Sequence, residues 1–149
     1  MSPKRFHFRL ESVLEIRKNK QEQEEKIYMK LVDELSRLDR QIEEVQKEQK
    51  RVFEECELKL TGTLMLDEWR RDLDYIRYLE EVIAQLKRRR QEVDLQRLRQ
   101  KEVMIEATKK RKTMDLLKEK YLQEYMFEMN RLEQIEIDDW VTTGYMRRG

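Results

Sequence analysis

Two basic runs and one acidic segment are the parts of this sequence whose residue types could do chemistry or bind a charged ligand. The basic runs span residues 87–90 and 109–112, and such clusters of lysine and arginine can neutralise nucleic-acid phosphates. Four consecutive helical residues point about 100° apart, however, so each run would encircle its helix. Carboxylates also lie near the two runs, at Glu80, Glu81, Glu92, Asp94, Glu102 and Glu106. We expect a solvated charged surface, with a docking patch for an acidic protein as the alternative, and no nucleic-acid partner.

The acidic segment, residues 133–139, contains four carboxylates, which raises the question of calcium binding or acid–base catalysis. Its spacing lacks the alternating oxygen ligands and the glycine of a calcium loop. Acid–base catalysis needs a pocket that shifts the pKa of a carboxyl group, and a pair of helices does not supply one. The sequence also lacks the common nucleotide-binding, zinc-protease and nucleophile-elbow motifs. We therefore predict that the chain is not an enzyme and binds no cofactor.

Cys56 and His7 are the single cysteine and the single histidine of the chain. They lie far apart in the sequence and do not form a metal-ligand cluster, and one cysteine cannot form an internal disulfide. We expect no metal site, and we expect Cys56 to be a buried or unreactive thiol.

The composition indicates which elements carry these residues. Of 149 residues, 38% are hydrophobic and 44% are charged, which is too little apolar material for a compact globular core. Long helices with a narrow apolar stripe fit this composition, and the periodicity is helical. The formal net charge of +1 gives no overall attraction to nucleic acid or to an anionic membrane. Neither a membrane-spanning apolar run nor a secretory signal is present, so we expect a cytoplasmic protein without a transmembrane segment.

Helix-breaking residues interrupt the chain once in its interior. No proline or glycine occurs between Pro3 and Gly62 or between Gly62 and Gly144, and Gly62 can adopt the left-handed conformation that ends a helix. The predicted elements are a first helix at about residues 6–59, a turn at about 60–65, a second helix at about 66–138 and a tail at 139–149. The prediction is a single all-α domain, a long antiparallel two-helix coiled coil with a longer second helix.

Apolar residues recur at alternating intervals of four and three, which is the heptad pattern of a coiled coil. In the first helix this seam, the stripe that faces the partner helix, comprises Leu31, Leu35, Leu38, Ile42, Val45, Gln49, Val52 and Cys56. In the second helix it comprises Trp69, Leu73, Ile76, Leu79, Ile83, Leu86 and Val93. The pattern loses its phase at residues 17–26 and 96–113. Antiparallel pairing places these two stretches opposite each other, so we predict a softer joint there.

Two groups of apolar residues remain once the seam is assigned. Near the turn, Tyr75, Tyr78 and Val82 widen the apolar surface beyond what one helix covers, although the tyrosines can instead flank the seam with their hydroxyls in water. At the other end, residues 121–140 extend beyond the start of the first helix and are rich in aromatic residues and methionine. Such surfaces often bind other proteins.

Four groups of residues occur in a recognisable order along the chain. They are Phe6-x-Phe8-x-Leu10-x-x-Val13-Leu14-x-x-Arg17; Trp69 with Tyr75-Ile76-x-x-Leu79-Glu80-x-x-Ile83; Lys110-Arg111-Lys112 before Leu116-Leu117; and Glu133-x-x-Glu136-x-Asp138-Asp139 with Tyr145. In order and spacing they are similar to the family of the bacterial flagellar export protein FliJ, over nearly the whole chain. Trp140 departs from the pattern, because a smaller residue is expected there.

The resemblance implies a non-enzymatic component of the flagellar type III protein export apparatus, built as a coiled coil that looks like the stalk subunit of rotary ATPases. It implies three kinds of partner: the hexameric ring of the flagellum-specific ATPase, the membrane-embedded export gate protein and export chaperones. We expect such a protein to lie at the cytoplasmic face of the cell membrane as a peripheral protein, and to be a monomer in solution.

The resemblance also suggests where the partners bind. By analogy with a rotary stalk, the end that carries both termini would enter the ATPase ring, through Phe6, Phe8, Leu10, Arg17, Leu116, Leu117, Tyr121, Tyr125 and Leu132. The surface for the export gate or a chaperone would lie nearer the turn, at Val45, Val52, Tyr75, Leu79, Val82 and Leu86. The leading hypothesis is a subunit that binds the ATPase, promotes its assembly and turnover and couples it to the gate. The alternatives are a chaperone escort and a general coiled-coil scaffold.

Overall fold

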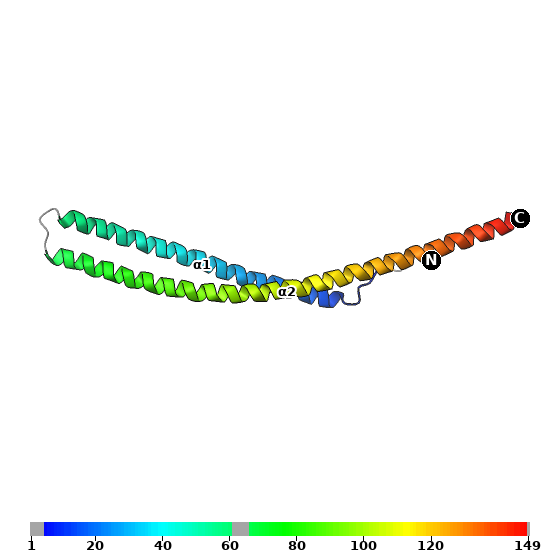
Figure 1. Cartoon of the computed structure of the whole chain (residues 1–149), viewed down its shortest axis with the longest axis horizontal. Helices are drawn as coiled ribbons and strands as arrows, with labels where there is room; N and C mark the ends of the chain where they lie inside the picture. Colours follow the sequence, from blue (N-terminus) through cyan, green and yellow to red (C-terminus); the bar gives the residue numbers. More distant parts are fainter. Residues whose placement is uncertain (1–4, 61–65, 149) are drawn as a thin grey trace. The chain divides into compact units, whose positions relative to one another are not determined.

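The computed structural model describes residues 5–60 and 66–148. These residues form two helices, α1 (Glu11–Leu60) of 50 residues and α2 (Leu66–Arg148) of 83 residues, and the described residues contain no strand. Figure 1 shows the cyan part of α1 beside the green part of α2. The predicted all-α class, the packing of two helices and the longer second helix are confirmed. Apart from Leu60, which ends α1, the turn predicted at 60–65 lies outside the described residues.

The C-terminal end of α2 differs from the prediction. The helix begins at Leu66 as predicted but continues to Arg148, so the tail expected at 139–149 is helical as far as it is described. No proline follows residue 138, and Gly144 keeps a helical conformation without a positive φ. A glycine inside a helix costs about 1 kcal/mol relative to alanine, which is too little to end so long a helix.

The N-terminal end of α1 also differs, because the helix begins at Glu11 rather than at residue 6. The Glu11 amide donates to the Phe8 carbonyl at 3.1 Å, and the Leu14 amide donates to the Leu10 carbonyl at 3.0 Å. Before Glu11, apolar and polar residues alternate, with Phe6, Phe8 and Leu10 at every second position. Alternate residues of an extended chain point to the same side, so both phenylalanine rings can face α2.

The helices pack in two compact units. The central unit comprises residues 24–104, and the terminal unit comprises the described residues up to Gln23 and from Ile105 onward. In each unit α1 and α2 run antiparallel. The contacts between them show this, since residues later in α1 contact residues earlier in α2. The pairs are Glu34–Arg89 and Lys59–Asp72 in the central unit, and Glu11–Lys118 and Gln21–Arg111 in the terminal unit.

The apolar core of the central unit is the predicted heptad seam. Leu35, Leu38 and Val93 form a buried cluster, and Leu31 and Leu86 pack against it. The seam residues buried nearer the turn are Ile42, Val52, Cys56, Leu79 and Ile83, and the remaining predicted seam residues are partly buried. Removing this surface from water contributes about 25 cal/mol per Å² of apolar area. The prediction that the Cys56 thiol is buried is confirmed.

Heptad spacing continues where the apolar residues become sparse, which corrects the prediction that the seam loses its phase there. In α1 the spacing continues toward the N-terminus through Tyr28, Glu24, Gln21 and Arg17, all of them buried or half-buried. In α2 it continues through Arg97, Gln100, Met104, Ala107 and Arg111, which are also buried or half-buried. Both helices therefore keep their seam positions, and polar side chains occupy many of them. The softness expected of this stretch stays a prediction.

Candidate protein-binding surfaces

The residues predicted for the gate or chaperone surface all lie in the central unit, but the structure divides them by exposure. Val52 and Leu79 are buried in the seam; Val45, Val82 and Leu86 are half-buried beside it; and Tyr75 is exposed. A buried seam residue holds the two helices together and has little surface left for a partner while the seam is closed. Tyr75 is therefore the best placed of the six to contact another protein.

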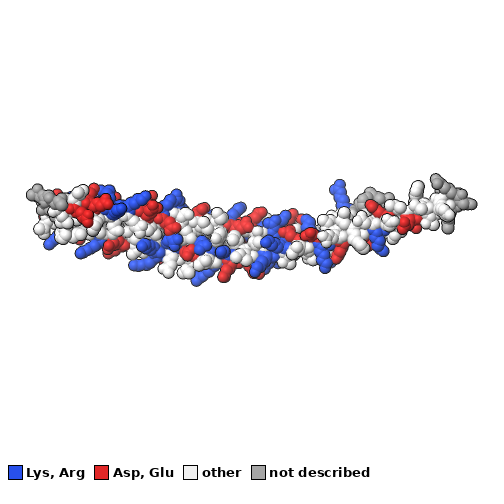
Figure 2. Space-filling model, turned by 45° about the horizontal axis from the view of Figure 1, so that its top comes forward, with Lys and Arg blue, Asp and Glu red and all other residues white. Residues whose placement is uncertain are grey.

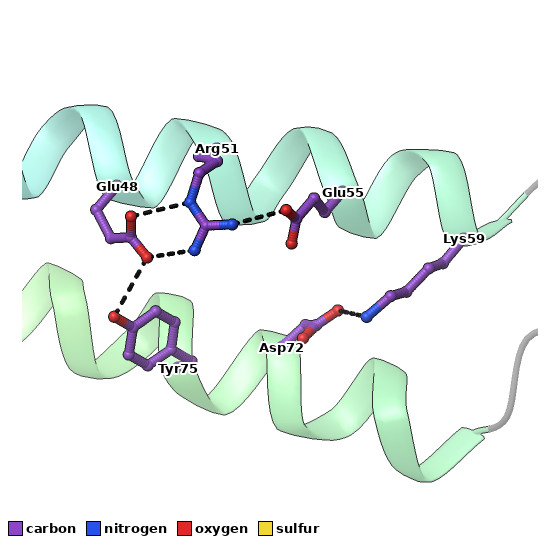
Figure 3. Close-up of polar contacts among 6 residues, drawn as sticks. All are labelled: Glu48, Arg51, Glu55, Lys59, Asp72 and Tyr75. Atoms are coloured by element: carbon purple, nitrogen blue, oxygen red, sulfur yellow. Dashed lines mark hydrogen bonds and ion pairs between the residues drawn. The ribbon is translucent and has the colours of Figure 1, made fainter.

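An aromatic pair forms the accessible part of this surface. The rings of Tyr75 and Tyr78 stack with their centroids 6.3 Å apart, and both side chains are exposed. The Tyr75 hydroxyl donates a hydrogen bond of 3.5 Å to the Glu48 carboxylate on α1 (Figure 3). An exposed pair of tyrosines offers rigid apolar area together with polar hydroxyls, a combination that is common in protein interfaces.

A charged network on α1 positions Glu48 beside Tyr75, as Figure 3 shows. Arg51 donates two hydrogen bonds to the Glu48 carboxylate, at 2.6 and 3.0 Å, and one to Glu55 at 2.6 Å. The hydrogen bonds from Arg51 lower the pKa of Glu48, and the same contacts raise the pKa of Arg51. Glu48 therefore keeps its negative charge at neutral pH and remains an acceptor for the Tyr75 hydroxyl.

The ends of the helices nearest the turn are joined by a cross-helix ion pair and surrounded by exposed apolar residues. The Lys59 ammonium donates to Asp72 at 2.9 Å, and this hydrogen bond raises the pKa of Lys59. Large apolar side chains are exposed nearby at Phe53, Leu58, Leu60 and Leu66. These four residues were not predicted from the sequence. The sequence feature that could have predicted them is the group of leucines on both sides of Gly62, where the seam between the two helices must end.

In the terminal unit, aromatic residues before α1 pack on α2. The rings of Phe6 and Tyr125 have centroids 5.6 Å apart, and those of Phe8 and Tyr121 are 5.9 Å apart. The Lys118 ammonium lies 2.8 Å from the Glu11 carboxylate, which adds a polar contact next to the rings. These contacts extend the interface between the N-terminal segment and α2 as far as Tyr125.

The residues predicted to enter the ATPase ring also differ in exposure. Leu116, Tyr121 and Leu132 are exposed; Phe6, Leu10, Arg17, Leu117 and Tyr125 are half-buried; and Phe8 is buried. The structure brings Phe6 together with Tyr125 and Phe8 together with Tyr121. Leu132 lies further along α2, away from this cluster.

The last part of α2 carries many exposed apolar side chains. Every residue from 130 to 143 is exposed. Figure 1 shows this orange and red stretch without a second helix beside it. The large apolar side chains exposed there and just before are Met126, Phe127, Leu132, Ile135, Ile137, Trp140, Val141 and Tyr145. Val141 and Tyr145 lie in the predicted tail, and the helical conformation of that tail adds them to this surface.

The two basic runs contribute to helix pairing. Arg89 forms an ion pair of 3.0 Å with Glu34, and Arg90 pairs with Asp39, both across the central unit. The contact with Asp39 raises the pKa of Arg90. In the terminal unit Arg111 donates to the Gln21 side chain at 3.0 Å. Part of each run therefore contacts the partner helix, although the Arg89 and Arg90 side chains stay partly exposed to solvent.

No group of three or more histidine, cysteine, aspartate or glutamate side chains in residues 5–60 and 66–148 is arranged to hold a metal ion. Over the same residues, neither helix contains a stretch that is apolar and long enough to cross a membrane.

Comparison with known proteins identifies the family. No curated protein and no solved structure matches the chain. The model of the family described as flagellar FliJ protein matches residues 6–149, nearly the whole chain. This match covers both helices and both surfaces described above, and it identifies a coiled-coil protein related to flagellar export. The chain belongs to the FliJ family of flagellar proteins.

Proposed function

We propose that this chain binds the hexameric ring of the flagellum-specific ATPase through its terminal unit, promotes the assembly and turnover of that ring, and couples it to the membrane export gate. The protein acts without catalysis of its own, as a peripheral component at the cytoplasmic face of the membrane. The observation that carries the proposal is the exposed end of α2, where a long helix continues beyond the residues that pack against it.

The length of this end supports insertion into a ring. From residue 126 to residue 145 the helix is about 30 Å long, at 1.5 Å per residue. Trp140 is 78% exposed and Phe127 is 72% exposed, so large side chains are available to a surrounding surface. Exposed aromatic side chains of this size are characteristic anchors in protein interfaces. A single helix that carries such residues on several sides suits a partner that surrounds it.

The gate contact is proposed for the central unit, at Tyr75 and Tyr78. Their exposure and mutual stacking support this position, and the hydrogen bond between Tyr75 and Glu48 orients one of the two rings. The half-buried Val82 and Leu86 lie further along the same helix and can extend the contact. The same surface supports the second candidate function, a chaperone escort, because an export chaperone would also need exposed aromatic side chains to bind.

Co-purification followed by site-specific crosslinking tests the assignment of the two units. We expect the purified ATPase to co-elute with the chain and to crosslink to a photoreactive residue at position 137, but not to one at position 78. The purified cytoplasmic part of the gate protein, or an export chaperone, should give the reverse pattern. Crosslinking of the ATPase at position 78 alone would contradict the assignment of the terminal unit. Crosslinking of a chaperone but not the gate protein at position 78 would favour the escort function.

A further inference from the structure

The apolar face of α2 that packs against the N-terminal segment continues toward the C-terminus beyond the last residue that this segment covers. Along α2, Met129, Leu132 and Trp140 return to the side of the helix that carries Tyr125, given about 3.6 residues per turn. Tyr125 is covered by the Phe6 ring, whereas Leu132 and Trp140 are exposed. The face that packs against the N-terminal segment therefore continues along α2 without a cover from the described residues. A partner that binds there would extend an interface that already exists.

Carboxylates share this face with the apolar residues. Between positions 124 and 143 the sequence contains six carboxylates and one basic residue. The basic residue, Arg131, is engaged by Glu128 at 2.6 Å. Figure 2 shows acidic side chains interleaved with uncharged ones along this end of α2. The stretch that precedes it, residues 105–120, has more basic than acidic residues, so the sign of the charge reverses along the helix.

Two of these carboxylates lie beside the indole of Trp140. Glu133, Glu136, Ile137 and Trp140 together line a shallow open hollow on the surface of α2. They follow one another along one side of the helix, in the i, i+3, i+4 and i+7 pattern, so they form a continuous patch. A hollow with two carboxylates and the face of an indole matches a lysine or arginine side chain, which can pair with the carboxylates and lie over the ring.

The negative charge of this face of α2 indicates which kind of molecule can bind there. A nucleic acid and the anionic cytoplasmic leaflet of a membrane would both be repelled by the carboxylates. A second copy of this chain, packed through the same face, would bring like charges together. A protein surface with apolar contacts and a protruding basic side chain satisfies both parts of the face.

We propose that Glu133, Glu136, Ile137 and Trp140 form a receptor site for a lysine or arginine side chain of the partner protein, at the edge of the apolar face that continues from Tyr125. The proposal rests on the proposed function, because it describes how the partner of the terminal unit is recognised. It assigns a role to Trp140, the residue that departs from the family pattern. The carboxylates steer the partner to the site, and the indole and Ile137 contribute contact area.

The test measures the affinity of the full chain for the purified export ATPase at increasing salt concentration. We compare the unchanged chain with E133Q/E136Q, with Trp140→Leu, and with E44Q/E54Q. The last variant removes the same number of exposed carboxylates from α1 in the central unit. Circular dichroism checks that all four chains are equally helical, which we expect because every altered side chain is exposed.

The two variants of the proposed site, E133Q/E136Q and Trp140→Leu, should bind the ATPase more weakly than the control variant E44Q/E54Q. E133Q/E136Q should bind about tenfold more weakly at low salt and show a flatter salt dependence, because the charged contacts are lost. Trp140→Leu should lose a similar factor at every salt concentration, because leucine supplies no ring face for the cation. E44Q/E54Q should stay within about twofold of the unchanged chain. Equal affinity and equal salt dependence for E133Q/E136Q and E44Q/E54Q would overturn the receptor site while leaving the ATPase as the partner.

A second measurement decides the proposal if the unchanged chain does not bind the ATPase, a result that would itself refute the proposed function. The four chains are eluted with salt from a matrix whose groups carry both an amine and a phenyl ring. E133Q/E136Q should elute at lower salt than E44Q/E54Q if the carboxylates and the indole act together. Elution of both variants at the same salt would overturn the receptor site. Dimerisation of the unchanged chain in sedimentation that E133Q/E136Q strengthens would overturn it in favour of self-association.

Discussion

Gln100 on α2 donates two hydrogen bonds from its side-chain amide to Glu24 on α1, one to the backbone carbonyl at 3.1 Å and one to the carboxylate. Glu24 is 7% exposed and occupies a seam position, so a charged residue lies inside the helix pair of the central unit. Asp94 and Tyr28 raise the pKa of the nearby Arg97 through hydrogen bonds. A polar pair at seam positions favours one register, because a shifted register would leave these groups without partners.

The pairing of Glu24 with Gln100 makes Glu24→Ala destabilising. The substitution leaves the half-buried Gln100 amide without its carboxylate partner, which costs about 1 kcal/mol. Urea denaturation followed by circular dichroism measures the loss. Glu22→Ala, which alters a neighbouring exposed glutamate outside the seam, is the matched control and should change the free energy of unfolding by less than about 0.5 kcal/mol. Equal losses for the two variants would show that the Glu24 contact does not stabilise the helix pair.

The exposures of Tyr75 and Leu79 predict opposite consequences for two alanine substitutions on one helix. Leu79 is 6% exposed, so Leu79→Ala should cost about 2–5 kcal/mol of stability. Tyr75→Ala should leave helicity nearly unchanged and weaken binding of the gate protein or an export chaperone. Thermal unfolding and a binding titration separate the two effects. A stable Leu79→Ala chain that fails to bind would instead place Leu79 in the interface.

Leu79 and Glu24 also show how far the sequence determines the fold. The heptad of leucine, isoleucine and valine predicted the helices and the central seam, because burying apolar residues at that spacing contributes most to the stability of a helix pair. The polar continuation of the seam was missed because Arg17, Gln21 and Glu24 look like surface residues in sequence. The side-chain partners of Gln21 and Glu24, which are Arg111 and Gln100, lie on the other helix, far away in the chain, and the pattern of apolar residues alone does not reveal such pairs.

The bidentate contact between Arg51 and Glu48 has a measurable acid–base consequence. Because the hydrogen bonds from Arg51 lower the pKa of Glu48 in the folded chain, the contact stabilises the fold above the unfolded pKa of about 4.3. This contribution is lost as the pH falls through the lower folded pKa. Carboxyl NMR of Glu48 should therefore show a higher pKa in Arg51→Gln than in the unchanged chain. An identical titration in both chains would exclude the contact in solution.

The packing of Phe8 against Tyr121 predicts a local effect at the start of the chain. Phe8 is buried, and truncating a buried phenylalanine to alanine costs about 3 kcal/mol or more. The loss should be confined to the terminal unit, because the segment before Glu11 is not helical and packs through its side chains. Hydrogen exchange should therefore speed up around residues 8–14 in Phe8→Ala. The amides of Leu35 and Leu38, in the central unit, serve as the internal control and should keep their protection.

The sequence predicted which residues lie in the binding surfaces, but the structure shows which of those residues are accessible. Tyr75 and Leu132 are accessible, as a binding role requires, whereas Val52, Leu79 and Phe8 are buried. The heptad pattern places all of the predicted central-unit residues in or near the seam. Whether a given side chain is buried or exposed depends on which of these neighbouring positions the facing helix covers, and the sequence of one helix does not show this. The helical conformation of Val141 and Tyr145 was not predicted, because the second helix was expected to end at about residue 138.

The rate of ATP hydrolysis by the purified export ATPase, measured while this chain is added over a wide concentration range, tests the proposed binding of this chain to the ATPase. We predict a saturable increase in turnover with co-elution of the two proteins, and a right-shifted curve for a Leu132→Ala/Trp140→Ala chain. Unchanged turnover together with no co-elution at any concentration would contradict the proposed function.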